Sequence, residues 1–148
     1  IEKEYKEGLK EGLIYSYLII IDDLIGDINK MGRGKSSDVM KHLILNRGHL
    51  NTSIIICSQK FRELPPVYRV NASHSIIFPT KSRLEIESII QDTNLFYNEK
   101  EFKNALMYCW QEAYSFAYID MENNKLYKRF EYEIKVDEEI DTKEFNEN

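Results

Sequence analysis

Apolar residues in this chain gather into short runs that alternate with amphipathic segments. Continuous runs rich in β-branched residues at positions 17–21, 52–57 and 75–78 are typical of strands buried within a sheet. Apolar residues at helical spacing, opened by capping residues such as Ser36 or Ser37, predict helices. These helices are expected over residues 1–12, 36–46, 82–91 and 98–112. Two further strands, at 114–120 and 125–134, are predicted to form a hairpin through residues 121–124.

The alternation of strands and helices indicates an α/β fold. It predicts βαβ units and a mainly parallel sheet flanked by helices, with an antiparallel hairpin at the C-terminal end. We expect one domain over residues 1–135, because neither a linker nor a repeat interrupts it. Residues 136–148 are expected to form a flexible acidic tail, since eight acidic residues and only two Lys lie between positions 131 and 148.

Composition and charge narrow the class of protein. With 148 residues, 43% apolar and 30% charged, the chain can build a globular core. The apolar run at 17–21 is far too short to cross a membrane, so no membrane segment is expected. A net charge of −5 argues against a surface that attracts nucleic acid throughout. Cys57 and Cys109 lie in apolar settings, and we expect both to be buried free thiols.

The segment MGRGKSS at 31–37 resembles the end of a phosphate-binding loop. Such a loop reads G-x-x-x-x-G-K-S/T and lies between a buried strand and a helix. Its first glycine would fall at Asn29, and the segment comes well after the strand at 17–21, so we do not assign it that role. We interpret it either as a solvated basic loop or as a DNA-phosphate contact. The basic candidates for that contact are Lys30, Arg33, Lys35 and Lys41.

Two carboxylates follow the first strand directly. Asp22 and Asp23 should lie at the carboxyl edge of the sheet, where ligands bind in open α/β folds. One carboxylate there can hold Mg²⁺ and the other can orient or deprotonate a water, although a polar turn would look the same. Gln59 follows the second strand, and it should lie beside the carboxylates if the two strands are neighbours. Its amide can both donate to a phosphate oxygen and accept from a water.

The order of these motifs resembles a known family. IIIDD is followed by a helix, then by R-G-H-x-N-x-S-I-I-I-x-S-Q, LPP-x-x-R-x-N and IIF. This order, over about residues 17–90, is similar to the second half of the poxvirus-type genome-packaging ATPases, which belong to the FtsK–HerA group of P-loop motors. The resemblance implies a partial P-loop NTPase core that uses ATP and Mg²⁺. It also implies that the phosphate-binding loop precedes this part of the polypeptide, so we expect the chain to be part of a longer protein and inactive alone.

The resemblance also implies roles for individual residues. Asp22 matches the Walker B carboxylate that binds Mg²⁺, Asp23 the catalytic acidic position, and Gln59 the glutamine that ends the sensor strand. Arg47 matches an arginine that acts as a finger on the neighbouring subunit's nucleotide, a contribution worth roughly 10³–10⁵ in rate. The family usually has Gly-Arg-His where this chain has Arg47-Gly48-His49, which shifts the arginine by one position. Arg69 is a second candidate for the finger, with a structural ion pair as the other interpretation.

For the intact protein, the resemblance implies a motor that couples ATP hydrolysis to the movement of double-stranded DNA into a capsid. Its expected partners are DNA, further copies of itself in a ring, and a capsid or portal protein. The expected location is the viral assembly site in the host cytoplasm, or the virion. Two other functions stay open. One is a non-catalytic assembly module, and the other is a metal-dependent nuclease in which Glu85 and Glu87 complete the ligand set.

Overall fold

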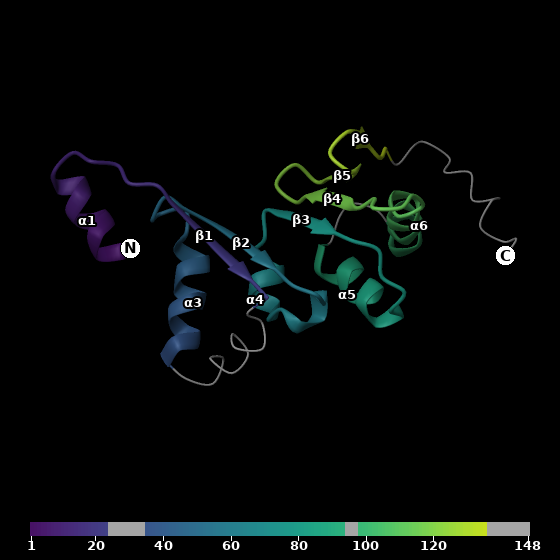
Figure 1. Ribbon diagram of the computed structural model, residues 1–148, viewed down its shortest axis with the longest axis horizontal. Coiled ribbons are helices and arrows are strands. Elements are labelled where there is room, and N and C mark those ends of the chain that lie inside the picture. Colours follow the sequence, from purple (N-terminus) through teal and green to yellow (C-terminus); the bar gives the residue numbers. More distant parts are fainter. Residues whose placement is uncertain (24–34, 94–97, 136–148) are drawn as a thin grey trace, which may run out of the picture. The chain divides into compact units, whose positions relative to one another are not determined.

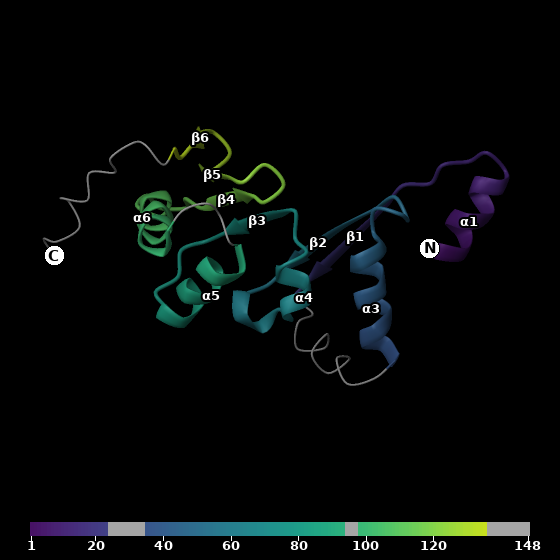
Figure 2. The same ribbon diagram turned by 180° about the vertical axis from the view of Figure 1, so that it is seen from behind.

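The computed structural model describes residues 1–23, 35–93 and 98–135, with side chains from Val39 onward in the second range. The chain divides into two compact units, Ile1–Asn71 and Ala72–Asn148 (Figure 1). Figure 2 shows the same elements from behind. Each unit has a sheet of its own, one parallel and the other antiparallel.

A parallel pair of strands forms the centre of the first unit. Strand β1 (Tyr17–Asp22) pairs with β2 (Thr52–Cys57) in a register that sets Tyr17 opposite Thr52 and Asp22 opposite Cys57. Helix α3 (Lys35–Asn46) connects the two strands, so that together they form a βαβ unit. The strands lie side by side along their whole length and therefore end at the same edge.

One face of this parallel pair is covered and the other is exposed. Ile21 packs with Ile44 of α3 and Tyr68 of α4 (Pro66–Arg69) in a buried cluster. Leu18 and Ile20, which point to the opposite face, are 61% and 62% exposed. The sequence had predicted strands covered on both faces. In the described part of the chain, α3 and α4 supply the cover for one face only.

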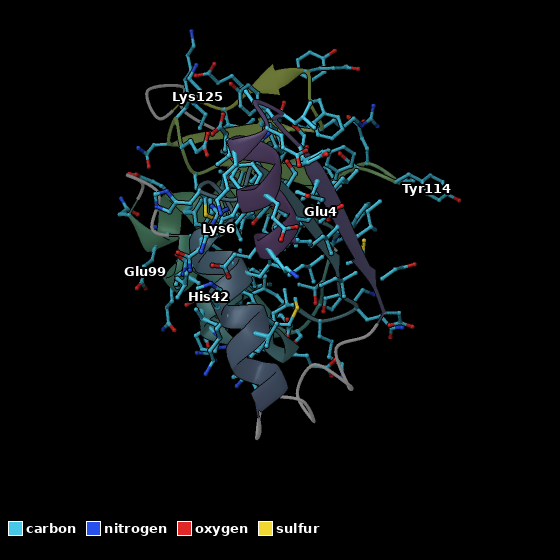
Figure 3. All side chains as sticks on the ribbon, turned by 90° about the vertical axis from the view of Figure 1, so that its left-hand side faces the viewer. Glu4, Lys6, His42, Glu99, Tyr114 and Lys125 are labelled. Atoms are coloured by element: carbon cyan, nitrogen blue, oxygen red, sulfur yellow. The ribbon has the colours of Figure 1, made fainter. Side chains whose placement is uncertain are left out.

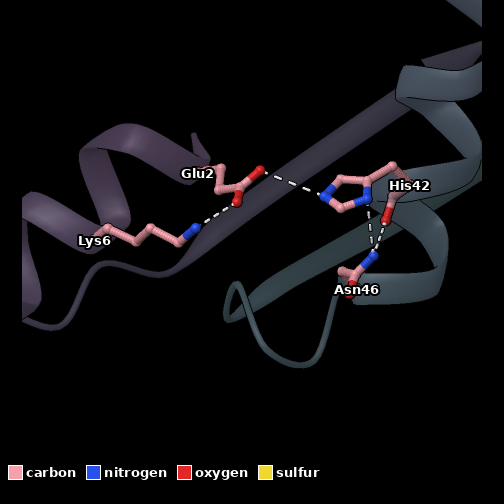
Figure 4. A network of polar contacts seen from close by, with 4 residues as sticks. All are labelled: Glu2, Lys6, His42 and Asn46. Atoms are coloured by element: carbon pink, nitrogen blue, oxygen red, sulfur yellow. Dashed lines mark hydrogen bonds and ion pairs between the residues drawn. The ribbon is translucent and has the colours of Figure 1, made fainter.

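Helix α1 (Glu2–Lys10) is linked to α3 by a short polar network. Glu2 accepts a hydrogen bond from Lys6 Nζ at 2.6 Å and lies 3.4 Å from His42 Nε2 (Figure 4). Asn46 Nδ2 lies 3.2 Å from His42 Nδ1 and also donates to the main-chain oxygen of His42. Lys6, and to a smaller extent His42, hold the pKa of Glu2 below its ordinary value. These groups are exposed, so the network orients α1 more than it stabilises it.

The second unit packs two helices with a four-stranded antiparallel sheet. The sheet has the order β3 (His74–Ile77), β4 (Ala117–Asp120), β5 (Lys125–Lys128) and β6 (Tyr132–Glu133). Helices α5 (Arg83–Thr93) and α6 (Glu99–Cys109) contact each other, and α6 contacts β5. The fully buried side chains come from both layers, namely Ile89, Phe102, Leu106, Cys109, Ile119 and Leu126. Trp110, just after α6, donates from Nε1 to the main-chain oxygen of Ile77 at 3.0 Å.

The α/β class, the parallel pair and the C-terminal hairpin of β4 and β5 are confirmed. The prediction that the third strand continues the parallel sheet is wrong, because β3 pairs antiparallel with β4. A short apolar run shows that a strand is buried, but its partner is set by which other strand offers a complementary face. Here Ser75 lies opposite Ile119, and Ile77 lies opposite Ala117. The single domain over 1–135 stays a prediction, and residues 136–148 lie outside the described residues.

Within the described ranges, no helix has both the length and the apolar character that crossing a membrane requires.

Candidate functional site

The carboxyl edge of the β1–β2 pair brings together residues that are 36 positions apart in the chain. Gln59 Nε2 donates a hydrogen bond to Asp23 Oδ1 at 3.1 Å. The contact follows from the register, since Asp22 lies opposite Cys57 and each strand is continued by one or two more residues. The expectation that Gln59 lies beside the carboxylates is therefore confirmed, whereas the chemical roles of these residues stay predictions.

The backbone at Asp23 leaves the strand in a left-handed conformation, with a φ of 52°. L-residues other than glycine rarely adopt it because Cβ approaches the main chain, although aspartate tolerates it better than most residues do. Such backbone conformations are concentrated at functional sites, where the surrounding structure maintains them. The turn directs the Asp23 side chain toward Gln59.

Asp22 and Asp23 are both exposed, so each can reach a ligand in solvent. Magnesium is commonly held by one or two carboxylates together with phosphate oxygens and waters, and this pair of carboxylates suits that kind of site. In the described ranges, no three His, Cys, Asp or Glu side chains cluster closely enough to hold a metal by themselves. The nuclease alternative, in which Glu85 and Glu87 join Asp22 and Asp23, stays a prediction, and Glu87 pairs with Arg83 on α5 at 2.7 Å.

Arg47 lies at the other end of the βαβ unit. Its Nη1 donates to the main-chain oxygen of Ile44 at 2.9 Å, which satisfies a carbonyl at the C-terminal end of α3. Its own carbonyl accepts from the amide of Thr52 at 2.8 Å, at the start of β2. Five strand steps separate Thr52 from Cys57, or about 17 Å at ~3.3 Å per residue. Arg47 is thus at the amino edge of the strands, and Asp23 is at the carboxyl edge.

Arg69 is the last residue of α4, a helix that comes after β2 in the chain. Its guanidinium carbon is 5.2 Å from the centre of the Phe61 ring. Phe61 begins the short 3₁₀ helix Phe61–Glu63, two residues after Gln59. Of the two candidate arginines, Arg69 is therefore the one held close to the chain segment that carries Gln59, through a cation–π contact.

The basic candidates are described only in part. Lys30 and Arg33 lie outside the described residues, and Lys35 begins α3 with a side chain that is also outside them. Lys41 is exposed on α3. Their proposed contact with DNA phosphates stays a prediction.

Cys57 adds a group to this edge that the sequence had not indicated. Its thiol was expected to be buried, but it is exposed at the end of β2, opposite Asp22. The apolar run Ile54–Ile56 did not indicate the exposure of Cys57, because alternate positions of β2 point to the exposed face of the strand pair. Cys109 is buried as expected, and burial raises the pKa of its thiol to about 12.

A parallel βαβ unit with two carboxylates and a glutamine at its carboxyl edge is consistent with a partial P-loop NTPase core. The family model of the poxvirus A32 protein matches residues 1–146. The chain therefore belongs to the poxvirus A32 family, a family of packaging ATPases. No curated protein and no solved structure matches the chain significantly.

Proposed function

We propose that this chain supplies the Mg²⁺-binding and water-activating part of a P-loop ATPase that moves double-stranded DNA into a viral capsid. The observation that carries the proposal is the hydrogen bond between Gln59 and Asp23 at the carboxyl edge of a parallel strand pair. Membership of the packaging ATPase family supports the substrate, ATP. The phosphate cradle is expected from another part of the polypeptide, because no segment of this sequence fits its motif.

The three residues at the edge divide the chemistry between them. Asp22, the last residue of β1, would hold Mg²⁺, and the metal would neutralise charge on the β- and γ-phosphates when bound. Asp23 would orient and accept a proton from the attacking water. Gln59 holds the Asp23 carboxylate through one amide N–H, and its amide oxygen is available to position the same water.

The two arginines would serve different nucleotides. Arg47 lies at the amino edge of its own strands, about 17 Å from their carboxyl edge, so it would act on a site in a neighbouring copy. Its Nη1 donates to the carbonyl of Ile44, and a guanidinium carries further N–H donors that can reach a phosphate oxygen. Arg69 would act within its own copy, from its contact with Phe61 in the segment that follows Gln59. This division supports a ring in which each site is completed by the next copy.

The wider role follows from the same family. DNA would run through the ring against a basic segment that includes Lys30, Arg33, Lys35 and Lys41. A capsid or portal protein would hold the ring at the viral assembly site. The acidic balance of the whole chain restricts this contact to one segment of its surface.

The test is ATP hydrolysis by the longest native polypeptide that contains this segment, with and without double-stranded DNA. We expect DNA-stimulated turnover that Asp23→Asn reduces by about 10²–10⁴. Arg83→Gln is the matched control, because it also removes a surface charge but lies on α5, where Arg83 pairs with Glu87. The isolated 148-residue chain is expected to show no turnover.

Arg47 and Arg69 can be separated by mixing copies. An Arg47→Ala polypeptide should regain turnover when it is mixed with an Asp23→Asn polypeptide, because a wild-type arginine and a wild-type carboxylate then meet at shared sites. Arg69→Ala should not be rescued in this way. If turnover is indifferent to Asp23, the carboxylates only end a strand, and the chain is better explained as a non-catalytic assembly module.

A further inference from the structure

The antiparallel sheet of the second unit has an aromatic face that its own helices do not cover. Residues paired directly across antiparallel strands share a face, so Ile76, Tyr118 and Tyr127 lie in one row. The opposite face carries Ala117, Ile119 and Leu126, all with no exposed surface, in the core with α6. The sheet therefore has a buried aliphatic side and a second side that is rich in aromatic residues.

The rings on this second side touch one another in a continuous chain. Phe78 contacts Phe116 at 5.7 Å between ring centres, and Phe116 contacts Phe130 at 5.0 Å. Phe130 contacts Tyr118 at 5.2 Å, edge to face. Tyr118 in turn contacts Tyr127 at 5.6 Å and His74 at 5.9 Å. We call these six residues the aromatic face.

The aromatic face exposes more apolar surface than an isolated side chain would. Phe78 and Phe130 are each 62% exposed, and Ile76 beside them is 48% exposed. Single exposed apolar residues are normal, but contiguous ones mark a binding surface. Phe and Tyr present large contact areas at a small cost in conformational entropy, and for this reason they are enriched at the centres of protein interfaces.

Carboxylates surround this face. Asp120 lies on the same face at the end of β4, 3.8 Å from His74, and Glu133 lies opposite Tyr127. Glu122 and Glu131 are exposed at the neighbouring turns. Burial, and after it the negative charges of Asp120 and Glu122, raise the pKa of Tyr118.

Two cations beside the aromatic face are paired with carboxylates. Lys125 Nζ lies 3.1 Å from Glu133, and Arg129 Nη2 lies 2.9 Å from Glu112. The described residues 72–93 and 98–135 carry ten Asp and Glu against eight Lys and Arg, and Glu122 and Glu131 are exposed at the turns beside the face. Exposed carboxylates beside the rings repel nucleic acid, even though aromatic rings could stack on bases. The charge favours a cationic ligand, because aromatic faces and carboxylates both attract Lys and Arg side chains.

We propose that the aromatic face is a docking site for a basic segment of a partner protein, with Arg or Lys side chains over the rings and aliphatic side chains between them. Phe78 and Phe130, which are each 62% exposed, supply the apolar contact. Glu122 and Glu131, which are exposed, supply the charge at its rim. The same combination exists within this unit, where Lys128 Nζ lies 4.7 Å from the centre of the Tyr108 ring and 2.7 Å from Glu112.

The test uses the longest native polypeptide containing this segment and three fluorescent probes read by anisotropy. The first is a short peptide of Arg-Leu-Ser repeats, the second replaces each Arg by Glu, and the third is a short oligothymidine. We expect the basic peptide to bind and the acidic peptide not to bind. The double variant Phe78→Ser/Phe130→Ser should weaken binding of the basic peptide by at least about tenfold.

Two further variants make the result specific. Tyr114→Ser is the matched control, because Tyr114 is 96% exposed and projects away from the neighbouring side chains (Figure 3), and it should leave the affinity unchanged. Glu122→Lys/Glu131→Lys removes rim charge at exposed positions without touching the rings. This variant should also weaken binding of the basic peptide, and it tests the proposal even if the double phenylalanine variant does not fold.

Several outcomes would overturn the proposal. Binding of the basic peptide that neither double variant weakens would place its site elsewhere, for example on the acidic residues after position 135. Oligothymidine binding that the phenylalanine variant weakens would make the face a single-stranded nucleic-acid platform. A self-association, measured by sedimentation velocity, that only the phenylalanine variant abolishes would make a second copy the occupant.

Discussion

The left-handed backbone at Asp23 predicts that glycine is more stable than alanine at this position, whereas alanine is more stable than glycine at the adjacent Asp22. At Asp23, with a φ of 52°, an alanine Cβ costs about 1–2 kcal/mol that glycine avoids. Glycine in turn lowers the free energy of unfolding by about 0.4–1 kcal/mol, because the unfolded chain has more conformational freedom. Both substitutions lose the Gln59 hydrogen bond equally. Asp23→Gly should therefore be more stable than Asp23→Ala by about 0.8 kcal/mol, the difference between the midpoints of the two ranges.

Asp22 is the matched control for this comparison. It ends β1 in an extended conformation, where glycine is less stable than alanine by roughly 0.5–1 kcal/mol. The free energy of unfolding of the four variants, measured by urea denaturation, should thus give differences of opposite sign at the two positions. If alanine is the more stable residue at both, Asp23 does not adopt the left-handed conformation, and the account of how its carboxylate reaches Gln59 fails.

Three other predictions test the core, the acid stability and the thiols. Leu106→Ala, at a fully buried position of α6, should lower the free energy of unfolding by about 2–5 kcal/mol, whereas Leu84→Ala, at a position that is 56% exposed, should cost far less. The side-chain and main-chain hydrogen bonds of Asn123 hold the pKa of Asp120 below its ordinary value near 3.8, so their contribution is complete above pH 3.8 and is lost as the pH falls through the lowered pKa. Asn123→Ala should therefore lower the urea midpoint at neutral pH and lose that difference in acid. A thiol reagent should modify Cys57 rapidly in the native chain and Cys109 only after unfolding, with no rapid reaction in Cys57→Ser.

The parallel strand pair and the position of Gln59 could be predicted from the sequence because both depend on strand length. Each strand is a β-branched apolar run that ends at polar residues, so the ends of neighbouring parallel strands coincide. That coincidence is enough to bring Gln59 to Asp23. The hydrogen bond itself needed the left-handed turn at Asp23, and no residue pattern predicted it, since aspartate adopts many other conformations.

Other features depend on tertiary contacts that hydrophobic patterns do not encode. The run at 75–78 marked a strand correctly, but its antiparallel partner β4 lies about 40 residues later in the chain. The apolar runs of β1 and β2 suggested cover on both faces, whereas Leu18, Ile20 and Ile55 are exposed. The aromatic face was missed because its residues come from β3, β4, β5 and the segments beside them, and only the strand register assembles them.

The geometry of the βαβ unit limits how its charged residues can cooperate. Helix α3 returns the chain from the carboxyl edge of β1 to the amino edge of β2, so it separates Arg47 from Asp23 by the length of the strands. The two edges lie roughly 17 Å apart, which is farther than an arginine side chain reaches. Arg47 and Asp23 of one copy therefore cannot act on the same phosphate without unfolding the unit. If both are needed for hydrolysis, the active form must contain at least two copies, with the amino edge of one facing the carboxyl edge of the next. The same geometry predicts turnover that rises more steeply than linearly with protein concentration at dilutions where the copies separate.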